Sequence, residues 1–154
     1  MTESTVAQGN SSPTIGAVIL AGGRSERFGR DKIVARLAGR PLIDHVLAAV
    51  PADWEVVVVG RPRCTARTVR WVLEDPPDGG PLAGVAAGVD TLGSEIVVVI
   101  AGDMPWVGRA GSDLVDRLRT AGPDVAAVVA RDETGHTNPL LAAYRREDLK
   151  AHLP

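Results

Sequence analysis

The chain has 154 residues, 45% of them hydrophobic, which suits one domain around a single hydrophobic core. Its formal net charge is -2 and its basic residues are spread along the sequence, which excludes a long positive tract for nucleic acid. The single cysteine excludes an internal disulfide and a cysteine-based zinc site, and the apolar runs are too short to cross a bilayer. We therefore expect a cytoplasmic protein that binds neither nucleic acid nor membrane.

Residues 1–13 are polar, rich in turn-forming residues and without periodicity, so we expect a disordered leader before a domain that covers 14–154. The first expected element is a strand over Ile15–Leu20, because its continuous apolar run is typical of a strand buried on both faces of a parallel sheet. A helix over 41–50 follows, since proline stands at its first position and apolar residues recur at helical spacing.

The remaining elements alternate in the same way. They are strands over 54–60 and 69–75, a helix over 81–92, a strand over 95–103, a helix over 111–121, and strands over 124–131 and 138–144. This alternation predicts an α/β fold, a three-layer Rossmann-like domain with a mostly parallel central sheet. In such sheets ligands bind beyond the carboxyl ends of the strands, near the point where strand order reverses. The loops after Leu20, Gly60, Leu73 and Ala101 are therefore the places to look for a site.

The first of these loops, LAGGRSERFGRDK over 20–32, combines three glycines with four basic residues. It matches neither the dinucleotide fingerprint nor the P-loop, whose glycine spacings differ. Glycines still let backbone N–H groups converge on an anion, and the basic residues supply charge. Lys32 is one of two lysines beside fifteen arginines, which hints at a compact ammonium that binds phosphate. The loop alone leaves two interpretations open, a phosphate site and a solvated surface turn.

Two acidic residues stand in other loops of the expected ligand face. Asp103 ends a predicted core strand, where a carboxylate suits Mg²⁺, although it can also be a turn residue ahead of Pro105. Asp75 precedes prolines and glycines and is typical of a turn. The helix after it opens at Gly80 and carries small residues on one face, which either pack closely on the sheet or leave room for a flat ligand.

The motifs LAGGRSERFGRDK, EDPPDGGPLAGVAAG, AGDMP and NPLLAAY together resemble, in order and spacing, the nucleotidyltransferase family that includes molybdenum cofactor guanylyltransferase. The resemblance covers nearly all of residues 15–144, and the double glycine looks more like the guanylyl than the cytidylyl branch. It implies a Mg²⁺-dependent transfer of GMP from GTP to the phosphate of molybdopterin or the molybdenum cofactor, with release of pyrophosphate. It also implies molybdoenzyme-maturation proteins as further partners.

The same resemblance implies roles for the positions that match these motifs. Arg24, Lys32 and Asp103 would be the catalytic groups, with Asp103 as the Mg²⁺ ligand. The nucleotide would be bound by these three and by Leu20, Ala21, Gly22, Gly23, Asp75 and Gly80, with Asp75 in the guanosine site. No general base is needed, because the attacking phosphate is already ionised.

Two departures from the family pattern stand out. Gly60 occupies a position where some members have a nucleotide-contacting asparagine, and the family usually continues past residue 154 with another helix, a short strand and an asparagine-containing segment. The pterin would bind around 136–141 and in that missing segment. Two alternatives follow, a cytidylyltransferase or other nucleotidyltransferase for a small phosphate acceptor, and a nucleotide-binding homologue without catalysis.

Overall fold

The computed structural model describes residues 12–22, 33 and 35–154, so residues 1–11 of the predicted leader and residues 23–32 of the glycine-rich loop lie outside it. The strands of the central sheet are β1 (Ile15–Leu20), β4 (Glu55–Val59), β5 (Arg70–Val72), β6 (Ile96–Ala101), β7 (Ala127–Arg131) and β8 (Thr137–Arg145). The other elements are a hairpin of β2 (Arg36–Leu37) and β3 (Arg40–Pro41), and the helices α1 (Leu42–Ala49), α2 (Gly80–Thr91), α3 (Ala110–Thr120) and α4 (Arg146–Lys150).

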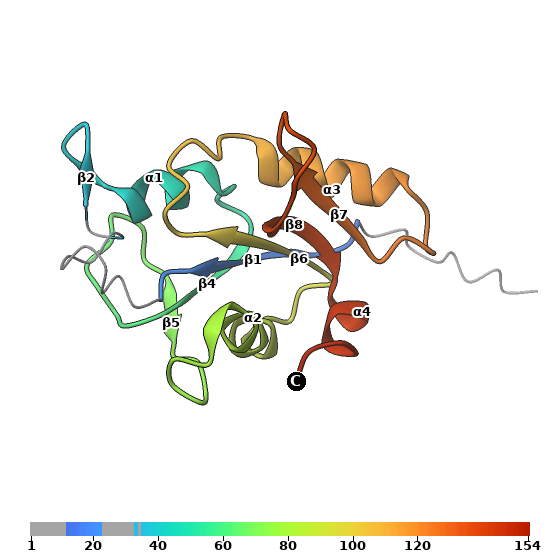
Figure 1. Ribbon diagram of the computed structural model, residues 1–154, viewed down its shortest axis with the longest axis horizontal. Helices are drawn as coiled ribbons and strands as arrows, with labels where there is room; N and C mark the ends of the chain where they lie inside the picture. Colours follow the sequence, from blue (N-terminus) through green and yellow to red (C-terminus); the bar gives the residue numbers. More distant parts are fainter. Residues whose placement is uncertain (1–11, 23–32, 34) are drawn as a thin grey trace, which may run out of the picture.

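The six strands lie in the order β5-β4-β1-β6-β8-β7. Helices α1 and α3 cover one face of this sheet, and α2 and α4 cover the other (Figure 1). Strands β5, β4, β1 and β6 are parallel to one another, while β8 is antiparallel to both β6 and β7. The predicted three-layer α/β domain with a mostly parallel sheet is thus confirmed.

The strand order reverses between β1 and β6. From β1 the chain moves to β4 and then β5 on one side, and it returns to β6 on the other side of β1. Ligands of open α/β sheets bind at such a switch point, outside the carboxyl ends of the two strands concerned. Here those ends are the start of the glycine-rich loop after β1 and the segment after β6.

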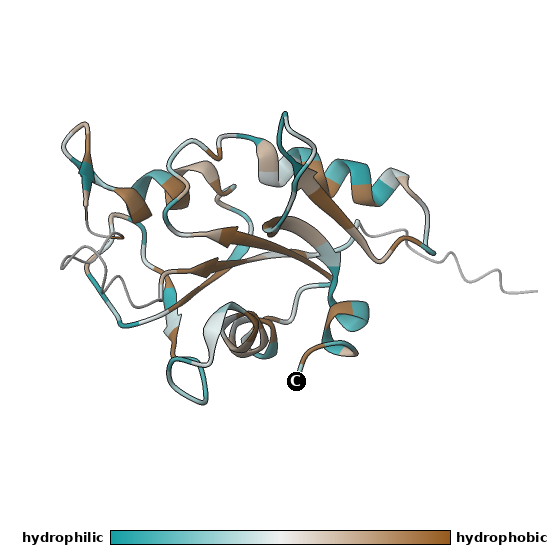
Figure 2. Cartoon of the chain, in the orientation of Figure 1, coloured by the Kyte–Doolittle hydropathy of each residue, from teal (hydrophilic) through white to brown (hydrophobic). Residues whose placement is uncertain are grey.

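The central strands form because both of their faces are buried. In β1, Ala17 and Ile19 belong to the hydrophobic core under α1 and α3, whereas Val18 belongs to the core under α2. Successive side chains of a strand point to opposite faces, so a strand covered on both sides needs a continuous apolar run. Figure 2 shows this as mostly hydrophobic central strands, with hydrophilic residues on the outer helices α3 and α4. No helix in the described part of the chain is long and apolar enough to cross a membrane.

The short elements are where pattern and structure differ. The strand expected over 69–75 is paired only over Arg70–Val72, and Leu73 beyond it is 64% exposed. The β2–β3 hairpin, with two residues in each strand, and α4, with five residues, were not predicted. Elements of this length contain too few residues to show a period of 2 or 3.6, so the apolar pattern carries no signal for them.

The small residues of α2 serve close packing of this helix on the sheet. A Cβ atom placed on Gly88 would lie 2.5 Å from Cγ1 of Val18, and one on Gly84 would lie 3.2 Å from Cδ2 of Leu20. Both glycines are buried and face β1. Of the two interpretations of this small-residue face, the structure therefore supports close helix-to-sheet packing for Gly84 and Gly88.

Replacing Gly88 with valine is expected to lower the free energy of unfolding by about 1–3 kcal/mol, the usual cost of overpacking a core. The reason is that the short, branched side chain of Val18 is fully buried and cannot move aside. Urea unfolding monitored by circular dichroism measures the change. Gly93→Val is the control, because no described atom lies within 4 Å of a Cβ there. Equal losses of stability in the two variants would contradict this packing argument.

Candidate functional site

The loops at the carboxyl edge of the sheet begin side by side. Three backbone hydrogen bonds extend the strand pairing by one residue beyond β1, β4 and β6. They run from Ala21 N to Val59 O, from Gly60 N to Val72 O, and from Gly102 N to Leu20 O, each over 2.8 Å. The candidate residues Leu20, Ala21 and Gly22 are therefore held between the loop that follows β4 and the loop that follows β6.

Asp103 lies beside this first loop at the switch point of the sheet. Gly102, the residue before it, is buried, and a Cβ atom there would lie 2.8 Å from the carbonyl oxygen of Leu20. Only a glycine lets the chain leaving β6 pass so close to the end of β1. The close packing of Gly102 thus fixes the backbone position of Asp103, and the aspartate itself is exposed to solvent.

The chemistry of Asp103 fits a Mg²⁺ ion that is shared with a phosphate ligand. In such sites Mg²⁺ takes one or two carboxylates, keeps several waters and binds phosphate oxygens, so a protein cage is not needed. Asp103 supplies one exposed carboxylate next to the loop after β1. Throughout residues 12–22, 33 and 35–154 there is no group of three or more His, Cys, Asp or Glu side chains that could hold a metal. The residues present therefore fit a metal bound together with a nucleotide.

Three candidate residues, Gly23, Arg24 and Lys32, lie outside the described residues. Ile33, which follows Lys32 in the chain, is only 8% exposed and belongs to the main hydrophobic core. Its Cδ1 atom would lie 2.9 Å from a Cβ atom on Gly102. The sequence analysis did not single out Ile33, although an apolar residue directly after a charged loop is a usable signal for an anchor. This anchor returns the chain to the core next to Asp103.

Asp75 and Gly80 belong to the segment that leads from β5 to α2, and Gly80 begins α2, whose next turn packs against Leu20 at Gly84. Asp75 is exposed, and the peptide bond from Asp75 to Pro76 is cis. Neighbouring strands are about 4.8 Å apart, so the end of β5, two strands from β1, is roughly 10 Å from the first loop. Glu74, which the sequence analysis missed, accepts a hydrogen bond from the backbone N–H of Asp78 (3.0 Å) and so braces this loop.

Gly60 is the position that departs from the family pattern, and its backbone explains why. Its φ angle is +145°, in a region that side chains disfavour, and a Cβ atom would lie 2.9 Å from the carbonyl carbon of Ala21. The atoms in the way are backbone atoms of the first loop, which cannot rotate aside. In this chain an asparagine at position 60 therefore has no room unless the loop after β1 moves.

Replacing Gly60 with asparagine is accordingly expected to lower the free energy of unfolding by about 1–3 kcal/mol, from backbone strain and overpacking together. The variant should also bind nucleotide less tightly than the parent, because Ala21 and Gly22 would be displaced. Thermal unfolding and nucleotide titration measure the two effects. Gly93→Asn, with the same side chain in open space, is the control. A Gly60→Asn variant as stable as this control would show that the loop adapts freely.

The region expected around 136–141 begins in the hairpin between β7 and β8. There the Thr134 hydroxyl donates to Oδ1 of Asp132 (2.7 Å), and this hydrogen bond, with others from backbone N–H groups, holds the pKa of Asp132 below its ordinary value. His136 Nδ1 is bonded to the same hydroxyl over 2.7 Å, so His136 is part of the exposed turn. Asn138, in contrast, reaches towards the loop after β6, with Nδ2 4.0 Å from Sδ of Met104.

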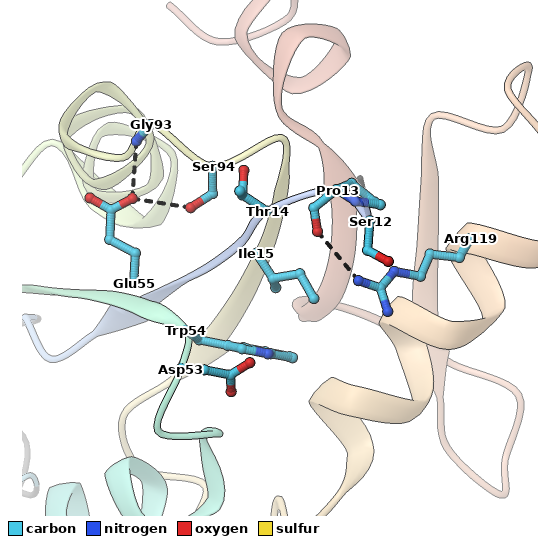
Figure 3. Close-up of a pocket in the computed structure, with 10 residues that line it drawn as sticks. All are labelled: Ser12, Pro13, Thr14, Ile15, Asp53, Trp54, Glu55, Gly93, Ser94 and Arg119. Atoms are coloured by element: carbon cyan, nitrogen blue, oxygen red, sulfur yellow. Dashed lines mark hydrogen bonds between the residues drawn. The ribbon is translucent and has the colours of Figure 1, made fainter. Parts of the chain in front are cut away.

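A pocket of about 500 Å³ lies at the opposite, amino-terminal edge of the sheet (Figure 3). Its polar groups are bonded to one another: Oε2 of Glu55 accepts from the Ser94 hydroxyl and from the Gly93 N–H, both over 3.1 Å. Arg119, across the pocket, donates to the carbonyl oxygen of Pro13 over 3.3 Å. These contacts tie the segment before β6 to β4 and the segment before β1 to α3. Those candidate residues that the structure describes are at the other edge.

Known proteins are similar to this chain over most of its length. The family described as MobA-like NTP transferase domain matches residues 17–153. A molybdenum cofactor guanylyltransferase from Rhodobacter capsulatus is 37% identical over 125 residues, which make up 77% of this chain and 64% of that protein. A probable molybdenum cofactor guanylyltransferase from Bacillus licheniformis is 36% identical over 136 residues, or 84% of this chain and 67% of that protein. The chain thus spans about two thirds of the length of these relatives.

A solved structure shows the same fold. Molybdopterin-guanine dinucleotide biosynthesis protein A from Archaeoglobus fulgidus aligns with a TM-score of 0.67 and 26% sequence identity. The alignment covers 90% of this chain and 72% of the other. This chain therefore shares its fold with that protein.

Proposed function

Because this chain belongs to the family of MobA-like NTP transferase domains, we propose that it transfers GMP from GTP to the phosphate of molybdopterin or the molybdenum cofactor, with release of pyrophosphate. The observation that carries the proposal is the contact of Leu20 and Ala21 with Gly102, the residue before Asp103, at the switch point. The names of the relatives from Rhodobacter capsulatus and Bacillus licheniformis support the choice of guanylyl transfer.

In the proposed reaction an oxygen of the acceptor phosphate attacks the α-phosphorus of GTP. A bond forms between this oxygen and the phosphorus, and the bond from that phosphorus to the oxygen that bridges to the β-phosphate breaks, so pyrophosphate leaves with the electron pair. Such transfers require alignment of the reactants and neutralisation of charge on the phosphate oxygens more than they require a covalent nucleophile. The protein therefore needs well-placed donors and cations at the triphosphate.

The described residues supply part of this set at one edge of the sheet, and the sequence after β1 supplies the rest. The exposed backbone at Gly22 can approach phosphate closely, and Arg24 and Lys32 follow in the same loop with positive charge. Asp103 would hold Mg²⁺, which when bound would neutralise charge on the triphosphate oxygens. Ile33 and Gly102, packed against each other, hold the two ends of this arrangement together.

The distance between the two groups of candidate residues suits an elongated nucleotide. With the triphosphate at the first loop, the guanosine would extend over the end of β4 towards Asp75 beyond the end of β5, roughly 10 Å away across two strand spacings, with Gly80 at the start of α2. Gly60 lies on this path and offers backbone only. We infer that the base is recognised from the β5–α2 side, and that the position after β4 sets how close the nucleotide can lie to the sheet.

A pyrophosphate-release assay tests the proposal. The chain is incubated with Mg²⁺, each nucleoside triphosphate in turn, and either molybdopterin, the molybdenum cofactor or another small phosphate. Release with GTP and molybdopterin supports guanylyl transfer, whereas preferential release with CTP supports the cytidylyltransferase alternative. Binding of GTP without release in the presence of acceptor supports the alternative of a nucleotide-binding homologue without catalysis.

The proposed reaction also implies where the protein acts and which proteins it meets. A single exposed cysteine is compatible with the reducing cytoplasm, which is where we place the reaction. The product would be used by molybdoenzymes, so proteins that mature these enzymes are the expected partners.

A further inference from the structure

One large aromatic side chain stands in solvent beside the candidate site. Of the three tryptophans, Trp54 is 7% exposed and Trp71 packs against the main core, but Trp106 is 82% exposed. Tryptophan is usually well buried because its ring carries a large apolar surface. An exposed indole in the loop that follows β6 therefore invites the question of what covers it.

The backbone of this loop fixes which residues face outwards. Its turns are closed by hydrogen bonds from Met104 N to Ala101 O (3.3 Å) and from Val107 N to Met104 O (3.1 Å). Met104 packs against the core and Val107 is buried, so these two side chains anchor the loop. Asp103 and Trp106 each precede one of the anchors and are exposed. An anchored loop thus presents a carboxylate and an indole to solvent, three residues apart.

The position of Trp106 in the sheet order favours the acceptor over the nucleotide. The nucleotide is assigned to the loops after β1 and β5, on one side of Asp103, with β4 between them. Trp106 lies in the loop after β6, and on the side away from β1 this loop is next to the start of β8. There Asn138 contacts Met104, which belongs to the same loop as Trp106. The acceptor attacks the α-phosphate from the side opposite the leaving pyrophosphate, so it needs a binding place of its own on that side. The β6–β8 side is the one that the nucleotide leaves open.

On the basis of the proposed function, we infer that Trp106 binds the acceptor by stacking on its planar heteroaromatic ring. An indole offers a large rigid surface at low entropic cost, and aromatic rings prefer offset stacking on it. Alanine-type truncation of a stacking aromatic commonly weakens ring binding by about tenfold or more. Trp106 is thus a specificity-determining residue, which raises the affinity for a pterin phosphate over that for a phosphate without a ring.

The test uses hydroxymethylpterin phosphate as the probe and glycerol phosphate as its ringless counterpart. Trp106→Leu keeps the apolar character and removes the ring, while Trp106→Phe keeps an aromatic ring. Affinity for both probes and for GTP is measured by calorimetry, and quenching of the pterin fluorescence reports stacking. We expect Trp106→Leu to bind the pterin compound about tenfold or more weakly, with GTP binding unchanged and with partial recovery in Trp106→Phe.

Equal affinity of the parent and Trp106→Leu for the pterin compound would overturn the inference. So would an equal loss of GTP affinity, or a change of oligomeric state in Trp106→Leu with pterin binding retained, which would assign Trp106 to a protein contact. The binding measurement is independent of catalysis. If the parent binds the pterin through Trp106 but releases no pyrophosphate with any nucleotide, the proposed function fails while this inference holds.

Discussion

Replacement of Lys32 by alanine is expected to lower the turnover of the proposed reaction by about 10²–10³-fold, the usual effect of deleting one preorganised donor that stabilises developing charge. The expectation rests on the family motif and on the composition of this chain, which uses lysine only twice. Negative charge moves onto the leaving pyrophosphate during the transfer, so a cation at the triphosphate helps the transition state more than the ground state. Steady-state pyrophosphate release measures the change.

Lys150→Ala is the matched control for this substitution. Lys150 is the other lysine of the chain, and its Nζ atom is 3.0 Å from Oδ1 of Asp90 near the end of α2. The helix rises about 1.5 Å per residue, so this ion pair lies roughly 15 Å from the start of α2 and has no part in the site. Lys32→Arg should recover activity only in part, because a planar guanidinium does not replace a compact ammonium. Turnover in Lys32→Ala equal to that of Lys150→Ala would remove Lys32 from the mechanism.

The long elements of the fold were predictable because each shows a clear hydrophobic pattern, either a continuous apolar run or a helical spacing. Residues 15–20 and 96–101 are continuous apolar runs, and the structure pairs them as the two strands of the switch point. The antiparallel direction of β8 was not predictable in this way, since an apolar run such as 140–143 has the same pattern in either direction. Direction depends on how the chain returns to the sheet, which is a property of the whole topology.

The candidate site was only partly predictable for a similar reason. A sequence pattern can place Asp103 after a strand, but it cannot show that Gly102 packs against Leu20 and Ile33 and thereby brings the two loops together. Gly60 is the clearest case. From the sequence it is a missing asparagine, whereas in the structure it is the residue whose backbone lies against Ala21. Such contacts link residues far apart in the chain, and no local pattern encodes them.

Trp106 is a residue whose proposed role could be recognised only from the structure. The motif AGDMP, which ends one residue before Trp106, drew attention to Asp103, and the sequence analysis did not single out the tryptophan. Only its exposure, next to the buried Val107, separates it from Trp54. Burial of aromatic residues in loops depends on the turn geometry, which here faces Met104 and Val107 inwards. The roles of Asp103 and Trp106 therefore became separable only with the loop in three dimensions.

Asp103→Asn is expected to remove the Mg²⁺-dependent part of GTP binding and leave the fold intact. The substitution keeps the size of the side chain and removes its charge, and a neutral amide is a poor ligand for a hard cation that is reluctant to lose water. Because Asp103 is exposed, its replacement leaves the packing of Gly102 and the core unchanged. GTP titrations with and without Mg²⁺ at equal ionic strength measure the effect, and thermal unfolding checks that the fold is retained.

The matched control is Asp124→Asn, an exposed aspartate ahead of β7 at the other edge of the sheet. It loses the same charge, so any effect of net charge on nucleotide affinity appears in both variants and can be subtracted. Asp103→Glu adds a second comparison, because it keeps the carboxylate but moves it outwards by one methylene, and it should retain part of the Mg²⁺ dependence. If Asp103→Asn binds GTP as tightly as Asp124→Asn at the same magnesium concentration, the metal is held by other groups, and the nucleotide's own phosphates become the principal ligands.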